Sequence, residues 1–382
     1  MKEIRRILWV SNAPWDGTAY AEQTALWVPG LAGLGYEMAI MAFHGLRGSP
    51  REWNGFTVYA GTDSAPYGGD ILGSHARHFG ADLIISLMDQ WACEVDPASL
   101  PCPMACWMPV DCEPLSLRDH TKLMETRAIP IAVSRFGEAQ LRDAGFDPLY
   151  VPHGLDTTKV FRPPEDRDAL RKAMGVQGKF VVLIVAANNK SYRKAWFEQF
   201  YAFARLLKRH DDAILVVHTQ RHPAYGNDLA TLADRLGISP AVRWSDQYLT
   251  TAGLVTPRMM AGTYGMSHLI SGCTQAEGFG MTPLEGMACG TPAVVTKGSA
   301  SDEVGGPAWK VRGQPAYAWG HESQWTTPFI DDIYRVYEKA YERGAAYQAK
   351  AAAARPHALT YDVDLVLEKF WVPALEAIQA RI

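Results

Sequence analysis

The stretch EGFGMTPLEGMACGTPAVV, residues 277–295, places two carboxylates, Glu277 and Glu285, on either side of a Gly-Phe-Gly turn. An apolar run that ends in small and polar residues precedes it, which is typical of a strand entering a loop. Thr282 at the N-cap position, Pro283 at the first helical position and Glu285 further on predict the start of a helix. The segment TPAVVT then predicts a second buried strand. The stretch is therefore a strand–loop–helix–strand unit in which a glycine-rich loop leads into a helix N-terminus.

That geometry suits an anionic ligand. Backbone N–H groups at the loop and at a helix start can converge on phosphate oxygens, and the helix dipole adds about half a positive charge. The two carboxylates would then accept hydrogen bonds from hydroxyl groups, a combination that a nucleotide sugar offers. The alternative is that Glu285 only closes a capping box and Glu277 is a solvated loop residue. The candidate nucleotide-binding positions are Gly278, Phe279, Gly280, Met281, Thr282 and Glu285.

The composition is that of a globular protein with two domains. A chain of 382 residues exceeds the usual size of one hydrophobic core. Its net charge of −4 gives no bulk attraction to nucleic acid or to an anionic membrane. No apolar run approaches the roughly 18 residues of a membrane span, and the N-terminus does not read as a signal peptide. The six cysteines include no Cys-x-x-Cys pair, so we expect free thiols, no zinc and a cytoplasmic location.

Strand-like and helix-like segments alternate along the chain, and the alternation occurs twice. Short apolar runs separated by amphipathic segments predict a parallel sheet with helices on both faces. The α/β alternation restarts after a proline-containing, charged connector. We therefore expect two doubly wound, Rossmann-like domains, with ligands outside the carboxyl ends of the strands. The expected division is a first domain at 1–157, a linker at 158–178, a second domain at 179–361 and a C-terminal helix at 362–382 that packs back on the first domain.

With this alternation and the glutamate pair together, the sequence resembles the retaining glycosyltransferases of family 4. The similarity extends from GTAYAEQT near the N-terminus, through VSRFGEAQLRDAG and VPHGLDTTKVF, to the glutamate pair in EGFG…LEGMACGTP. The resemblance implies the GT-B fold, in which two Rossmann-like domains face an interdomain cleft. It also implies retention of anomeric configuration, no metal and no other cofactor.

The resemblance assigns roles in the second domain. Glu277 would bind donor-sugar hydroxyls near the reacting carbon, Glu285 the ribose hydroxyls, and the amides after Glu277 the diphosphate. Lys194 matches the family's lysine in the loop AANNKSYRKAW, but Asn188 stands where the family has an arginine. Either Arg193 or Lys190 replaces the charge of that arginine, or the diphosphate is held with one cation fewer. Arg193 could also be an ordinary solvated loop residue.

The first domain matches the family less completely. Gly17 stands where the family brings backbone close to the diphosphate, but Thr18 replaces a second glycine that many members have. Asp111 occupies the segment in which the family often has a histidine beside the donor sugar, and it could equally cap the following helix. In the second domain, contacts near Ser245 are expected to choose the base.

The implied reaction is transfer of a hexosyl unit from a UDP- or GDP-linked sugar to an acceptor hydroxyl, with front-face attack. Lys194, Arg193 and the helix-terminal amides would stabilise the leaving diphosphate. The acceptor remains open among glycan, lipid, protein, small molecule and modified nucleic-acid base. The alternatives are a nucleotide-sugar-binding protein without activity, or an epimerase or phosphorylase on the same fold.

Overall fold

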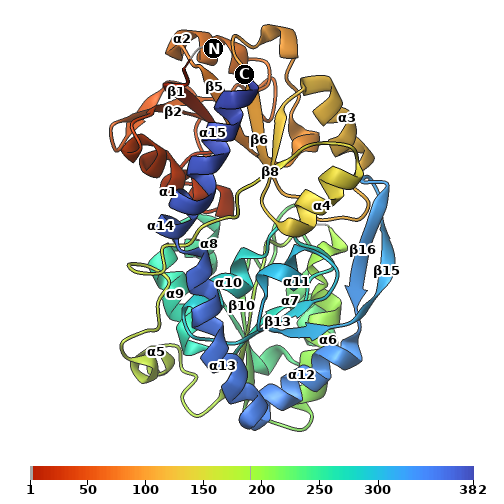
Figure 1. Cartoon of the computed structure of the whole chain (residues 1–382). Helices are drawn as coiled ribbons and strands as arrows, with labels where there is room; N and C mark the ends of the chain where they lie inside the picture. Colours follow the sequence, from red (N-terminus) through yellow and green to blue (C-terminus); the bar gives the residue numbers. More distant parts are fainter. Residues whose placement is uncertain (1–2, 190) are drawn as a thin grey trace. The chain divides into compact units, whose positions relative to one another are not determined.

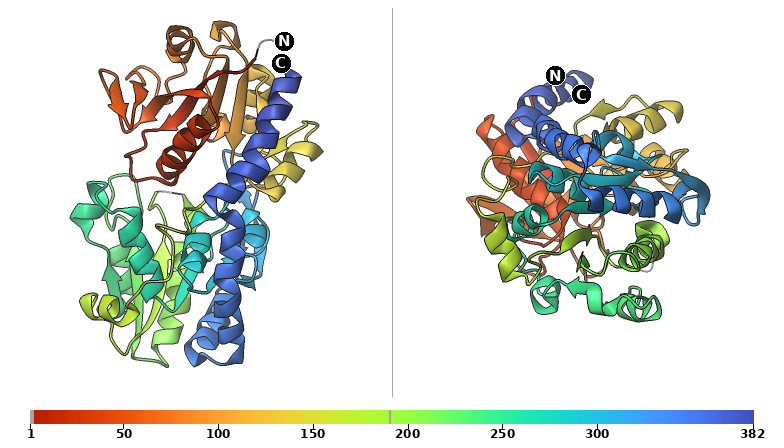
Figure 2. Two further views of the ribbon diagram at one scale, coloured as in Figure 1. Left: turned by 60° about the vertical axis from the view of Figure 1, so that its left-hand side comes forward. Right: turned by 90° about the horizontal axis from the view of Figure 1, so that it is seen from below.

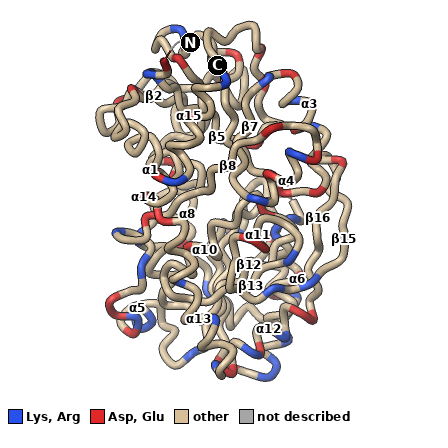
Figure 3. Tube along the Cα trace, in the orientation of Figure 1, with Lys and Arg blue, Asp and Glu red and all other residues tan. Residues whose placement is uncertain are grey.

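The computed structural model describes residues 3–189 and 191–382, and the chain forms two compact units. Unit 1 comprises residues 1–154, 319–323 and 363–382, and unit 2 comprises residues 155–318 and 324–362. Each unit is an α/β body built on its own mainly parallel sheet, as the repeated alternation predicts. Acidic and basic residues are interspersed along the trace of both units (Figure 3).

The sheet of unit 1 has eight strands in the order β3-β4-β2-β1-β5-β6-β7-β8 (Figure 1). Neighbouring strands are parallel, except that β3 runs antiparallel to β4 through a tight turn at Asn54 and Gly55, both with positive φ. The strands are β1 (Arg6–Asn12), β2 (Glu37–His44), β3 (Arg51–Trp53), β4 (Phe56–Ala60), β5 (Leu83–Leu87), β6 (Met104–Met108), β7 (Ile129–Ala132) and β8 (Leu149–Tyr150).

Helices and the chain's C-terminal segment cover the sheet of unit 1. They are α1 (Ala19–Gly33), α2 (Leu72–Phe79), α3 (Leu117–Thr126), α4 (Arg135–Asp143), α14 (Val363–Val366), a π-helical turn (Leu367–Trp371) and α15 (Val372–Arg381), with short 3₁₀ turns at Gln90–Ala92 and Pro97–Ser99. The chain termini lie side by side in both views (Figures 1 and 2), and the Ile4 N–H donates to Gln379 Oε1 over 2.7 Å.

Four tryptophans join the C-terminal segment to the sheet of unit 1. Trp9 on β1, Trp27 on α1, Trp107 on β6 and Trp371 are all fully buried. The ring centroid of Trp371 lies 5.0 Å from that of Trp107 and 5.9 Å from those of Trp9 and Trp27. This aromatic cluster places the C-terminal segment in the core of unit 1.

The sheet of unit 2 has six parallel strands in the order β11-β10-β9-β12-β13-β14. They are β9 (Phe180–Val185), β10 (Ala213–His218), β11 (Val242–Trp244), β12 (Leu269–Gly272), β13 (Ala293–Thr296) and β14 (Trp309–Val311). A separate two-stranded sheet pairs β15 (Gly313–Ala318) with β16 (Ser323–Pro328). From β9, successive strands are added on one side as β10 and β11, and on the other side as β12, β13 and β14. The switch point, where such sheets bind ligands, therefore lies between β9 and β12.

The helices of unit 2 follow its strands in the alternating pattern. They are α5 (Arg167–Ala173), α6 (Trp196–Leu207), α7 (Leu229–Arg235), α8 (Gln247–Thr251), α9 (Pro257–Met266), α10 (Met281–Ala288), α11 (Ala300–Val304), α12 (Ile330–Glu342) and α13 (Ala345–Ala358), with 3₁₀ turns at Tyr192–Lys194, Ser239–Ala241 and Leu359–Tyr361. Helix α6 packs on α12, and α10 packs on α9 and α13. Among the described residues, none of the helices has the length and apolar character needed to cross a bilayer.

Candidate active site in unit 2

Two loops bring a carboxylate against two cations at the carboxyl edge of the unit 2 sheet. Lys194 ends the loop after β9, and Glu277 lies in the loop after the neighbouring strand β12. Lys194 Nζ donates to Glu277 Oε1 over 2.7 Å, and Arg193 Nη1 donates to Glu277 Oε2 over 3.2 Å. The side chains keep between 12% and 24% of their surface exposed. The cluster is therefore ordered and still reachable by a ligand.

The ion pairs keep Glu277 ionised despite its burial. Burial by itself raises the pKa of a carboxyl group, but the charges of Lys194 and Arg193 outweigh it and lower the pKa of Glu277. Arg193 is fixed from two further directions: its Nη1 donates to Ala276 O over 2.9 Å, and its carbonyl accepts from the Gln275 N–H over 2.6 Å. The Arg193 side chain is thus part of the site and not a solvated loop charge.

The glycine-rich loop leads into α10 with a geometry that favours an anion. Gly280 has φ +104°, a left-handed conformation that side chains rarely adopt, and it is the N-cap of α10. No side chain caps this helix. The first turn therefore presents backbone N–H groups and the positive end of the helix dipole at the carboxyl edge of the sheet.

The helix start differs from the sequence prediction. Helix α10 begins at Met281, so Thr282 lies within the first turn and is not the N-cap. The predicted capping box is therefore wrong, because Glu285 lies too far along the helix to reach back to the N-cap. Because Gly280 can adopt a positive φ, the helix begins two residues earlier than the Thr-Pro pattern suggests.

Glu285 is buried on α10 and has a specific partner. Its side chain is 8% exposed, and its Oε2 accepts from the Tyr264 hydroxyl over 2.5 Å. Burial raises the pKa of Glu285 to about 7, while the hydrogen bond from Tyr264 opposes that rise. The carboxyl group therefore titrates near neutral pH, which an ordinary solvated or capping glutamate does not do.

Asn188, which the resemblance places where the family has an arginine, has a structural use. Asn188 Nδ2 donates to Gln220 O (2.9 Å) and to Asn227 O (2.8 Å), and its Oδ1 accepts from the Asn227 N–H (2.9 Å). The side chain thus holds the loop after β10 against the loop after β9. Lys190, the other candidate for the missing charge, lies outside the described residues.

The remaining predicted residues fall in three places. Ser245 follows β11 at the same edge of the unit 2 sheet, and its Oγ lies 3.0 Å from Thr250 Oγ1. Gly17 and Thr18 lie in unit 1, in the loop after β1, where the Thr18 side chain caps α1 by accepting from the Ala21 N–H over 3.2 Å. Asp111 follows β6 in unit 1 and is partly exposed.

Within the second unit the structure gathers Lys194, Arg193 and Glu277 with the loop formed by Gly278, Phe279 and Gly280. Phe279 is 4% exposed, and its ring centroid lies 5.6 Å from that of Tyr361. Its buried side chain therefore fixes the loop to the body of unit 2. The sequence analysis did not predict two contacts of these glutamates. Ser299 Oγ accepts from the Glu277 N–H over 3.2 Å, and Tyr264 pairs with Glu285. Ser299 follows β13, so a search for polar residues after each buried strand would have found it.

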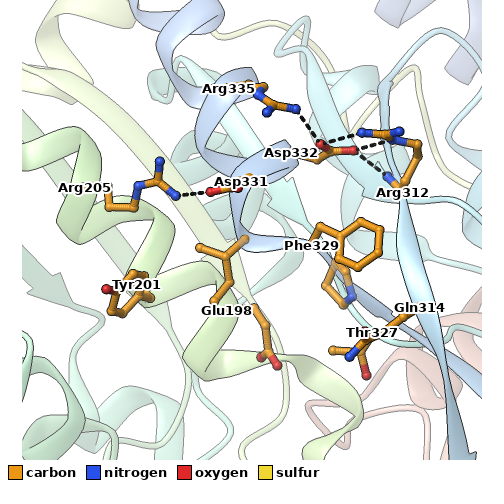
Figure 4. Close-up of a pocket in the computed structure, with 12 residues that line it drawn as sticks. Glu198, Tyr201, Arg205, Arg312, Gln314, Thr327, Phe329, Asp331, Asp332 and Arg335 are labelled. Atoms are coloured by element: carbon orange, nitrogen blue, oxygen red, sulfur yellow. Dashed lines mark hydrogen bonds and ion pairs between the residues drawn. The ribbon is translucent and has the colours of Figure 1, made fainter.

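A surface hollow of unit 2 is separate from this cluster. It has a volume of about 530 Å³ and lies between α6, β15, β16 and the start of α12. Figure 4 shows Arg312 and Arg335 turned toward Asp332, at 2.8 Å and 3.1 Å, and Arg205 turned toward Asp331. The lining residues include none of the predicted site residues. Each of these three arginines pairs with a neighbouring carboxylate, and Arg312 and Arg335 share Asp332.

Comparisons with known proteins agree with this arrangement. Residues 166–308 match the family model described as glycosyl transferases group 1. The alpha-monoglucosyldiacylglycerol synthase of Streptococcus pneumoniae is 30% identical over 147 residues, which are 38% of this chain and 31% of that protein. The chain thus matches about a third of the length of that relative. The described residues contain no group of three or more His, Cys, Asp or Glu side chains placed to hold a metal ion.

Solved structures resemble the chain over nearly its whole length. Sucrose-phosphate synthase from Thermosynechococcus elongatus superimposes with a TM-score of 0.76 at 14% identity, covering 98% of this chain and 100% of that one. HepE of Anabaena, in complex with UDP and glucose, gives 0.71 at 16% identity with the same coverages. The fold is therefore GT-B, with two Rossmann-like units, and the segment 166–308, which carries Lys194, Glu277 and Glu285, is similar to the group 1 glycosyl transferases.

Proposed function

We propose that the protein is a retaining glycosyltransferase that moves a hexosyl unit from a nucleoside diphosphate sugar to an acceptor hydroxyl. The observation that carries the proposal is the ion-paired cluster of Glu277, Lys194 and Arg193 next to the uncapped start of α10. A carboxylate for sugar hydroxyls and a set of positive groups for a diphosphate occur there at one sheet edge. The match to the group 1 family and the GT-B fold support the same reading.

The chemistry follows from the charges in the cluster. As the bond between the anomeric carbon and the phosphate oxygen breaks, negative charge grows on the leaving diphosphate. Lys194, Arg193 and the N–H groups at the start of α10 stabilise that charge. The acceptor oxygen attacks the same face of the sugar, and its proton passes to the departing phosphate oxygen. The proposal includes no metal, because these groups supply the positive charge.

The donor roles divide between the two glutamates. Glu277, held ionised by its two cations, accepts hydrogen bonds from hydroxyls of the hexose. Glu285 lies on α10 beyond the phosphate-binding turn and accepts hydrogen bonds from the ribose. HepE is described in complex with UDP-glucose, which makes a uridine nucleotide the first donor to try. A cytoplasmic location, where such donors are made, goes with this proposal.

Isothermal titration with UDP and GDP, followed by incubation with UDP-glucose and GDP-mannose in EDTA, tests the proposal. We expect one nucleoside diphosphate to bind, and slow hydrolysis of its sugar without acceptor to release the hexose first as the α-anomer, visible by ¹H NMR. Release of the β-anomer would contradict retention. Binding without any turnover, with or without added metal, would favour a nucleotide-sugar-binding protein, and epimerised donor would favour an epimerase.

A further inference from the structure

The loop after β10, residues 219–228, carries a partly buried arginine whose side chain has no partner. Arg221 lies three residues after the end of β10, at the carboxyl edge of the unit 2 sheet. Its Nε is buried without a hydrogen-bond partner, and it makes no ion pair within residues 3–189 and 191–382. Taking a guanidinium out of water costs free energy unless an acceptor or a carboxylate compensates for it. In the part of the chain that the structure describes, the other arginines that are not exposed all have such a partner: Arg171, Arg193, Arg205 and Arg355.

The other titratable groups around this loop do not neutralise Arg221. Burial lowers the pKa of His218, so its ring is neutral. His222 Nδ1 lies 3.1 Å from Asp228 Oδ1, and the Asp228 carboxylate also caps α7. In the loop after β11, the Asp246 carboxylate caps α8. Both carboxylates therefore have other partners.

The backbone of Arg221 is fixed by a glutamine from the neighbouring loop. The Arg221 N–H donates to Gln247 Oε1 over 2.7 Å. Gln247 Nε2 donates to Thr219 O over 3.1 Å and to Ser245 O over 2.8 Å. One side-chain amide therefore joins the loops after β10 and β11 and holds Arg221 in place.

The Arg221 loop is also held against the loop after β9. Asn188 Nδ2 donates to two of its carbonyl oxygens. A Cβ atom at Gly226 would lie 2.7 Å from Asn188 O, so this close approach requires glycine. Strands β10 and β12 are the two neighbours of β9. The loop after β9 therefore meets the Arg221 loop at Asn188 and meets Glu277 at its other end, through Lys194.

The ion-paired cluster at that other end is short of positive charge for a diphosphate. Lys194 and Arg193 share one ionised carboxylate, Glu277, which cancels the charge of one of them. The diphosphate of a nucleotide sugar carries negative charge on both phosphates, and it gains more as the sugar leaves. The start of α10 contributes only about half a positive charge. A further cation at this sheet edge would improve the balance, and Arg221 is a cation without a counter-charge.

We propose that Arg221 binds a phosphate of the donor's diphosphate. The inference rests on the proposed glycosyl transfer and adds a residue to its donor site. The planar guanidinium can donate two parallel hydrogen bonds to phosphate oxygens, and the phosphate compensates for the burial of the positive charge. Asn188 and Gln247 are positioning residues, because they act through the Arg221 loop.

Calorimetric titration with UDP, uridine and pyrophosphate tests the proposal without requiring turnover, with GDP and guanosine in place of the uridine compounds if the wild type binds GDP. Arg221→Ala should weaken the binding of UDP and of pyrophosphate by about tenfold to a hundredfold, as expected for charge-assisted hydrogen bonds, and leave uridine affinity unchanged. Arg221→Lys should recover part of the loss, because it keeps the charge but not the planar fork. Arg235→Ala, at an exposed arginine that ends α7, should match the wild type.

Equal UDP affinity in Arg221→Ala and the wild type overturns the proposal. An equal loss of affinity for uridine and UDP also overturns it, because the partner of Arg221 would then be the base or the ribose.

The ligand-free variant separates a binding role from a structural one. Arg221→Ala removes a partly buried cation that has no counter-charge, so it should unfold at the wild-type temperature or above it. The rise in Tm that UDP produces should be smaller in the variant than in the wild type. A lower Tm of ligand-free Arg221→Ala would show that the arginine supports the fold, contrary to the proposal.

Asn188→Ala tests the positioning role. It should weaken UDP binding by about fivefold in the wild-type background and by less than about twofold when residue 221 is already alanine. The same loss in both backgrounds would show that Asn188 does not act through Arg221.

The failure of this inference and the failure of the proposed function have different signatures. A wild-type protein that binds neither UDP nor GDP would contradict the proposed function itself. A wild type that binds UDP, together with Arg221→Ala of equal affinity, would contradict the role of Arg221 alone.

Discussion

Lys194 Nζ lies 2.7 Å from Glu277 Oε1 although the two residues are 83 positions apart in the chain. They meet because β9 and β12 are neighbours in a parallel sheet, so the loops at their carboxyl ends emerge side by side. The pair has two consequences. The lysine keeps the glutamate ionised, and the glutamate keeps the lysine in a fixed place before a ligand arrives.

Replacing Lys194 should affect catalysis far more than folding. In Lys194→Ala, the charge that develops on the leaving diphosphate loses one preorganised donor, and we expect kcat with a saturating donor to fall by about two orders of magnitude. Arg193 still pairs with Glu277, so the fold should persist, as circular dichroism would show. Lys208→Ala, an exposed lysine after α6, is the control and should keep wild-type turnover. Turnover of Lys194→Ala within a few-fold of wild type would contradict the assignment.

Removing Trp371 should destabilise unit 1 strongly. The side chain is fully buried against Trp9, Trp27 and Trp107, and its truncation leaves a large cavity. We expect Trp371→Ala to lower the free energy of unfolding by about 3–5 kcal/mol and Trp371→Phe by less, measured by urea denaturation. Leu34→Ala, at a 43% exposed leucine that ends α1, should change it by no more than about 0.5 kcal/mol. Equal midpoints for Trp371→Ala and wild type would show that the C-terminal segment does not support the core.

One surface residue is in a backbone conformation that glycine would adopt at lower cost. Arg127 ends α3 in the left-handed region with φ +52°, and its side chain is exposed. Arg127→Gly should raise the free energy of unfolding by about 0.5–1 kcal/mol, because the strain relieved exceeds the extra chain entropy of glycine. Arg127→Val should lower it, because a β-branched side chain is worse in this region. Urea midpoints for the pair give the sign, and a lower midpoint for Arg127→Gly would exclude strain at this position.

The sequence predicts the two α/β units and the glycine-rich loop before α10 because those features are encoded locally, whereas Lys194 entered the candidate site through the resemblance to a known family. Apolar runs mark buried strands, and polar residues directly after them must collect at one sheet edge, which brings Glu277 to Lys194. The predicted start of α10 was wrong because Gly280 adopts a positive φ and caps the helix, ahead of the cap that the Thr-Pro pattern predicts at Thr282. Neither the Tyr264 hydroxyl on Glu285 nor the inclusion of residues 319–323 in unit 1 follows from local pattern, since both depend on tertiary contacts.

The raised pKa of Glu285 gives a pH dependence that separates its two interpretations. Burial raises the pKa of this carboxyl group to about 7, from an ordinary value of 4.5. The folded state therefore favours the protonated form of Glu285. The contribution of this group to the free energy of unfolding is fully present below about pH 4.5 and is lost as the pH rises through about 7. Wild-type protein should therefore lose thermal stability between about pH 4.5 and pH 7 relative to Glu285→Gln, which has no proton to release there.

Nucleotide binding should show the opposite trend. If ribose hydroxyls donate to Glu285, they bind the ionised carboxylate, so UDP affinity should increase by about tenfold from pH 6 to pH 8 as the group ionises. Glu285→Gln should bind UDP more weakly at pH 8, by roughly 1.5–3 kcal/mol, because a charge-assisted pair of hydrogen bonds is lost. The variant also corrects for the titration of the nucleotide's own phosphate, which is the same in both proteins.

Glu277→Gln is the matched comparison, because its proposed partner is the hexose and not the ribose. Its affinity for UDP and the pH dependence of that affinity should stay close to wild type, while transfer from UDP-glucose decreases. Calorimetric titrations of the three proteins at pH 6, 7 and 8 decide between the interpretations. If the wild type and Glu285→Gln share one affinity and one pH dependence, Glu285 does not hold the ribose, and its contact with Tyr264 serves the packing of α10 alone.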